Sequence, residues 1–112
     1  MIEVERILKR LNAESGMNVR AFLSGKFSEE ELRRKALEMK QKYYDALVEK
    51  RAIKASEGAH RIIVEEGKGM DISVGAAVKC KKGEITWDEL VNVCSTQVLP
   101  LARQEAEDAS KV

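Results

Sequence analysis

Two stretches of this 112-residue chain, residues 25–32 and 83–90, place a glycine shortly before a helix cap. In the second stretch, the Thr86 side chain is placed to accept a hydrogen bond from the Glu89 backbone N–H. The Glu89 carboxylate can in turn accept one from the Thr86 N–H, which completes a capping box. Glycine readily adopts the left-handed conformation in which many helices end. Both stretches therefore predict a tight turn that ends one helix and starts the next, antiparallel one.

The two stretches also share an apolar pair on either side of the cap, which is the arrangement of a hydrophobic staple. Offset by 58 positions, six of their eight residues agree in type, and the match fades outside this window. A duplication would explain the match, but convergent use of a common capping solution is the favoured interpretation. The cap and staple residues are Phe27, Ser28, Glu31 and Leu32 in the first stretch, and Ile85, Thr86, Glu89 and Leu90 in the second.

Composition favours helices over strands along the whole chain. Hydrophobic residues make up 44% and charged residues 35%, with 4% aromatics and one proline. Ala, Leu, Glu, Lys and Arg dominate and are good helix formers, and β-branched or aromatic residues form no alternating runs. We expect a single all-α domain over residues 1–112, a bundle of four to five helices with two capped hairpin turns and a long central helix.

Hydrophobic spacing predicts the helix boundaries in the first half. Residues 2–13 form an amphipathic pattern that Gly16 is placed to end, and residues 18–23 then predict a short second helix. The long central helix starts after Ser28, and its pattern extends to Gly58, where we expect a bend or a break. Its core stripe is Leu32, Ala36, Met39, Tyr43 and Ala46, with a neighbouring stripe at Leu37, Tyr44 and Val48.

In the second half, residues 65–69 predict a linker, with Asp71 as the cap of the helix that follows. Pro100 removes one backbone hydrogen bond and crowds the preceding turn, so we expect a kink near Thr96 in the last helix. Residues 109–112 are expected to fray. The core positions predicted for the last helix are Leu90, Val91, Val93, Cys94, Val98, Leu99 and Leu101.

The net charge of +1 argues against a global field for nucleic acids or for a membrane surface. Residues 1–56 carry 13 basic and 9 acidic side chains, whereas residues 57–112 carry 7 and 10. Acidic residues interrupt the basic ones of the long helix at ion-pair spacing, which favours a solvated face. Nucleic-acid binding is the alternative function, through Arg33, Arg34, Lys40, Lys50 and Arg51.

No combination of residues points to catalysis, a metal or a cofactor. Glu57 and His60 have the spacing of a helical metal-binding pair, but such sites need two pairs and the chain has one histidine. Cys80 and Cys94 occupy apolar positions without a nearby base, which favours small buried side chains with free thiols. The glycines of residues 67–69 are too few for a phosphate-binding loop.

We expect a cytoplasmic, non-enzymatic interaction or regulatory protein that binds another protein and self-associates as a homo-oligomer. The first residues are too acidic and polar for a signal peptide, no apolar run spans a bilayer, and two free thiols suit a reducing compartment. The wide apolar face of the long helix, in so small a chain, favours a partner. The capping box leaves Trp87 unused and Tyr43 and Tyr44 are adjacent, so these three are the candidate partner anchors.

Overall fold

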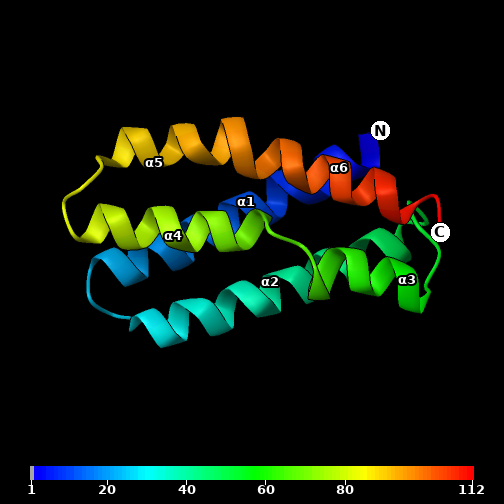
Figure 1. Cartoon of the computed structure of the whole chain (residues 1–112), viewed down its shortest axis with the longest axis horizontal. Coiled ribbons are helices and arrows are strands. Elements are labelled where there is room, and N and C mark those ends of the chain that lie inside the picture. Colours follow the sequence, from blue (N-terminus) through cyan, green and yellow to red (C-terminus); the bar gives the residue numbers. More distant parts are fainter. Residues whose placement is uncertain (1) are drawn as a thin grey trace.

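The computed structural model describes residues 2–112, which fold into a four-helix bundle (Figure 1). The described residues contain no strand, and the predicted all-α bundle is confirmed. Two π-helical turns, η1 and η2, adjoin the helices. The elements are α1 (Ile2–Leu23), α2 (Glu29–Glu49), α3 (Glu57–His60), η1 (Arg61–Glu65), α4 (Gly69–Lys81), α5 (Trp87–Val93), η2 (Cys94–Val98) and α6 (Leu99–Ala109).

The helices form two antiparallel hairpins whose turns lie at the same end of the bundle (Figure 1). α1 packs against α2 and α4, and α4 packs against α5. α5, η2 and α6 follow one another as one continuous ribbon along the 41 Å length of the molecule, and α6 packs against α1. None of the helices described is both long enough and apolar enough to cross a bilayer.

Both predicted hairpin turns are confirmed. Ser28 and Thr86 each accept a hydrogen bond of 3.1 Å from the N–H three residues later, and both capping boxes are complete. Gly25 and Gly83 have φ angles of 85° and 80°, a conformation that glycine adopts without strain. The staple residues of both turns pack in the same hydrophobic cluster.

α1 is a single helix, so the predicted end at Gly16 and the separate helix over residues 18–23 are wrong. Gly16 lies inside α1, where glycine costs about 1 kcal/mol relative to alanine. Ser15, Val19 and Phe22 are buried and continue the core stripe of the first turns. Tertiary packing along this stripe outweighs the local cost of the glycine.

α2 ends at Glu49, and its predicted continuation to residue 58 is wrong. Arg51 has a φ angle of 59°, and its N–H donates a hydrogen bond to the Val48 carbonyl at 3.0 Å. The Ala52 N–H donates to the Leu47 carbonyl at 2.9 Å, which completes a Schellman motif. Because an arginine holds the left-handed position that glycine usually takes, the sequence has no local signal for this helix end.

The helix break lies before Gly58 rather than at it. Gly58 is inside α3, whose start is capped by Ser56 through a hydrogen bond of 3.0 Å from the Ala59 N–H. The turn η1 continues directly from α3, so the chain is helical again from Glu57, one residue before the glycine.

The linker predicted at residues 65–69 is present but shorter, because η1 ends at Glu65 and α4 begins at Gly69, which leaves residues 66–68 as the connection. Gly67 and Gly69 are buried, and Gly69 is already the first residue of α4. A Cβ atom on Gly67 would lie 2.2 Å from the Ile63 carbonyl oxygen, so only glycine fits this position. Asp71, the predicted cap of α4, makes no capping hydrogen bond.

The irregularity predicted in the last helix is present as the turn η2, immediately before α6. Pro100 lies in the first turn of α6, directly after η2. The Thr96 hydroxyl donates a hydrogen bond to the Asn92 carbonyl at 2.7 Å. The chain therefore accommodates the proline through a wider helical turn rather than a break.

Two hydrophobic clusters fill the bundle, one near each end. The core stripe predicted for α2 is confirmed, because all five of its residues are buried. Leu37 is 57% exposed and Val91 is 46% exposed, so their predicted core positions are wrong. The cluster near the hairpin turns comprises Val19, Phe22, Leu32, Ala36, Val74, Ala76, Ala77 and Leu90.

Candidate functional site

A crevice of about 260 Å³ lies between α1 and the segment formed by α5 and η2. Small residues form part of the crevice lining, among them Ala13 and Gly16 on α1 and Ser95 on η2. A Cβ atom on Gly16 would meet only the Arg20 guanidinium, at 3.9 Å, so the glycine leaves room beside α1. The crevice is thus an open space between two neighbouring segments of the bundle, which do not pack tightly against each other at this point.

Trp87 lies at the end of the crevice nearest the hairpin turns. It is half-buried and packs against the cluster there. The Arg20 guanidinium lies 4.9 Å from the centroid of the Trp87 ring, a cation–π contact between α1 and α5. Such a contact stabilises by about 0.5–1 kcal/mol at an exposed site. The role of Trp87 as a partner anchor stays a prediction.

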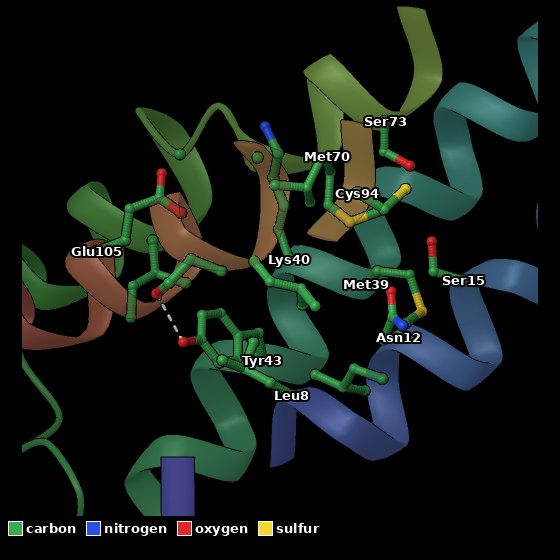
Figure 2. A pocket seen from close by; sticks show the side chains of 17 residues that line it. Leu8, Asn12, Ser15, Met39, Lys40, Tyr43, Met70, Ser73, Cys94 and Glu105 are labelled. Carbon is green, nitrogen blue, oxygen red and sulfur yellow. Dashed lines mark hydrogen bonds between the residues drawn. The ribbon is translucent and has the colours of Figure 1, made fainter. Parts of the chain in front are cut away.

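An internal cavity of about 60 Å³ adjoins the crevice. Its inner walls are apolar and include Leu8 and Met39. Figure 2 shows the Ser15 and Ser73 hydroxyls and the Cys94 sulfur turned toward one another, from α1, α4 and η2. The residues that line both the crevice and the cavity, here called the passage, are Asn12, Ser15, Ser73, Cys94 and Leu99.

Tyr43 lines the cavity from α2 and is 6% exposed. Its hydroxyl donates a hydrogen bond to the Ala102 carbonyl of α6 at 2.7 Å, drawn as a dashed line in Figure 2. Burial raises the pKa of Tyr43, so the phenol stays protonated in the folded protein. The side chain links α2 to α6. Because it is buried, it does not present the exposed surface that a partner anchor needs.

Charged groups lie at the end of the cavity where α4 begins. The Lys40 side chain is 11% exposed, and its Nζ lies 3.4 Å from the Asp71 carboxylate. The Glu105 carboxylate accepts a hydrogen bond of 2.9 Å from the Lys68 N–H, in place of a local cap. Burial raises the pKa of Glu105, against the lowering effects of the Lys68 N–H and the Lys40 charge. Each of these side chains therefore already has a partner within the fold.

The five basic residues predicted to contact nucleic acid do not form one surface stripe. Lys40 turns inward toward Asp71, and Arg33 is paired with Glu29 at 2.9 Å. A phosphate backbone would meet only part of the predicted set. The exposed members are Arg33, Arg34, Lys50 and Arg51.

Tyr44 and His60 form a separate half-buried group near the loop before α3. Their ring centroids lie 5.0 Å apart in an edge-to-face arrangement, and His60 Nε2 lies 3.0 Å from Gln41 Oε1. The Ser56 N–H donates a hydrogen bond to the Tyr44 hydroxyl at 3.3 Å. Tyr44 thus supports the loop, and its role as a partner anchor stays a prediction. Within residues 2–112, no three or more His, Cys, Asp or Glu side chains are arranged to hold a metal.

Both thiols, Cys80 and Cys94, are free and half-buried. Burial raises the pKa of Cys94, and the neighbouring Ser73 hydroxyl partly offsets this shift. The thiol rather than the thiolate therefore faces the passage at neutral pH. A protonated thiol is a poor nucleophile, but it can still donate and accept weak hydrogen bonds.

The sequence interpretation missed the three residues that shape this site most. Ser15 and Ser73 sit within apolar stripes of α1 and α4, and a buried hydroxyl in such a stripe is a recognisable signal. Glu105 lies in a polar helix and gives no local signal of its contact with Lys68. Its partner is 37 positions away in the chain.

No protein family, curated protein or solved structure matches the chain. A function must therefore be argued from the crevice, the passage and the exposed side chains beside them.

Proposed function

We propose that the protein is a non-enzymatic interaction protein that forms a two-fold homodimer through the outer surfaces of α1 and α5. One observation carries the proposal: apolar side chains remain exposed on both helices beside the crevice. Met17 on α1 is 69% exposed and Val91 on α5 is 46% exposed, and Ala13 on α1 is also exposed. With Arg20 and Trp87, these residues define the α1–α5 face.

A second copy of the chain suits the α1–α5 face because α1 carries exposed basic residues, Lys9, Arg10 and Arg20, whereas Glu84 and Asp88, at and just before the start of α5, are exposed and acidic. In a two-fold dimer the same patch meets on both copies, so α1 of each copy lies against α5 of the other. The charges of α1 and of the start of α5 would then attract across the interface. None of the ion pairs among residues 2–112 involves Lys9, Arg10, Arg20, Glu84 or Asp88.

The proposal is tested by placing a carboxylate in the α1–α5 face. We predict that wild type sediments at equilibrium with twice the mass of one chain. Met17→Glu should weaken the dimer by about tenfold or more, because an unpaired carboxylate would be buried in the contact. Circular dichroism should show the same helix content for both proteins.

Leu37→Glu is the matched control, since Leu37 is 57% exposed on α2 and lies outside the α1–α5 face. It should leave the mass unchanged. A wild type that sediments as a single chain over the accessible concentration range would overturn the proposal. Equal dissociation of both variants would place the contact elsewhere.

A further inference from the structure

We infer that the passage binds a small uncharged molecule, which presents one oxygen atom to the Ser15 and Ser73 hydroxyls and an apolar tail to the cavity. The two hydroxyls and the Cys94 sulfur come from three different elements and turn toward one another (Figure 2). Polar groups that converge beside an apolar cavity between helices are the usual form of a small-molecule site.

Both serines are buried residues, with Ser73 3% exposed and Ser15 9% exposed. A serine in a helix can donate to a carbonyl of its own preceding turn, as the exposed Ser95 does to Val91. Among residues 2–112, neither Ser15 nor Ser73 makes such a bond, and Ser73 has only the weakly bonding Cys94 thiol beside it.

No side-chain oxygen or nitrogen that is sealed from solvent within residues 2–112 lacks a hydrogen-bond partner. The Ser15 hydroxyl, which makes no hydrogen bond among residues 2–112, therefore reaches the open space of the passage, and Ser73 lines the same space beside the Cys94 thiol. A ligand oxygen placed between them would accept from one or both hydroxyls in a site of low polarity, where such bonds matter most.

The passage itself offers no free counter-charge to a charged ligand. The passage offers an amide, two hydroxyls and a thiol, none of which is charged. At the far end, Lys40 is held by Asp71, and Glu105 by the Lys68 N–H. An anion or a cation would lose its hydration there without gaining a free counter-charge.

Size limits the apolar part of the ligand to a short tail. The cavity of about 60 Å³ corresponds to roughly two water-sized groups at about 30 Å³ each. Leu8, Leu11 and Met39 supply its apolar walls, and the crevice of about 260 Å³ leaves room for the remainder. A short-chain alcohol or ketone has this combination of one polar atom and a flexible apolar chain.

The site goes beyond the proposed dimerisation, although the two are adjacent. The passage opens into the crevice that a second copy would cover, so a dimer would restrict access to it. The test therefore uses the Met17→Glu protein, whose substituted residue does not line the crevice. Its outcome is independent of whether wild type dimerises.

We predict that 1-hexanol, added to ¹⁵N-labelled Met17→Glu protein, produces saturable shifts of the Ser15, Ser73 and Cys94 amide signals in ¹H–¹⁵N spectra. Further substitution of Ser15→Ala and Ser73→Ala together should weaken binding by about tenfold, because both hydrogen bonds to the ligand oxygen are lost. Hexanoate should give no saturable shift, because its carboxylate finds no counter-charge.

Ser24→Ala is the matched control, since Ser24 is exposed and donates to the Ala21 carbonyl away from the passage. It should bind 1-hexanol as tightly as the parent protein. Shifts that rise linearly without saturation would overturn the inference. Unchanged affinity in the double alanine variant, or equal binding of hexanoate, would also overturn it.

Discussion

Glu105 caps the start of α4 from another helix and is subject to two opposing effects. The Lys68 N–H stabilises its charged form, whereas burial penalises the charge and raises its pKa above the usual 4.5. The folded protein therefore holds this proton more tightly than the unfolded chain does. The resulting contribution to stability is fully present below the unfolded pKa and is lost as the pH rises through the folded pKa.

Glu105→Gln should keep an acceptor for the Lys68 N–H while removing the cost of a buried charge. We predict that this variant is at least as stable as wild type at pH 7. Wild type should then gain stability relative to the variant as the pH falls toward 4.5, the usual pKa of a glutamate side chain. Urea denaturation of both proteins over this pH range measures the difference. The opposite trend would mean that the carboxylate charge stabilises α4.

Residues that act locally were predictable from the sequence, and residues that act across the fold were not. Ser28 and Thr86 cap helices three positions away, so their roles follow from spacing alone. Ser15 and Ser73 face one another only because α1 and α4 pack together. The hydrogen bond from Tyr43 to the Ala102 carbonyl likewise depends on tertiary packing, although the stripe position of Tyr43 correctly predicts its burial.

At the scale of elements, helix ends marked by glycine were predicted and the others were not. Gly25 and Gly83 end their helices with positive φ angles, as their neighbouring caps indicated. Arg51 ends α2 in the same conformation without that signal, and Gly16 lies inside α1 despite it. In both failures, burial of the neighbouring core residues outweighs local propensity.

The join between η1 and α4 depends on close packing at Gly67. A methyl group there would collide with the Ile63 carbonyl at 2.2 Å, and this backbone atom cannot move without disturbing η1. We predict that Gly67→Ala costs more than about 2 kcal/mol of unfolding free energy. Urea denaturation at neutral pH provides the measurement.

Gly75 in α4 is the matched control, because a Cβ atom there would meet nothing within 4 Å. Gly75→Ala should stabilise the protein by roughly 0.5–1 kcal/mol, the usual gain for alanine over glycine inside a helix. Effects of equal size and sign at the two glycines would contradict the packing assigned to this join.

At the scale of the whole molecule, the basic and acidic halves of the sequence form different helices of the bundle. The basic first half supplies α1 and α2, and the acidic second half supplies α4, α5 and α6. The crevice runs along the boundary between α1 and α5, with exposed apolar side chains on both sides. A dimer that pairs α1 with α5 of a second copy would bring these opposite charges together and cover the mouth of the passage.

The most direct test of this dimer is zero-length cross-linking of mixed unlabelled and ¹⁵N-labelled protein with a carbodiimide, followed by mass spectrometry. The reagent joins an amine to a carboxylate only where the two are in contact. We predict mixed-isotope cross-links from Lys9 on α1 to Glu84 or Asp88 at the start of α5. Cross-links that join only peptides of the same isotope would show that these contacts lie within one chain, and would contradict the proposed dimer.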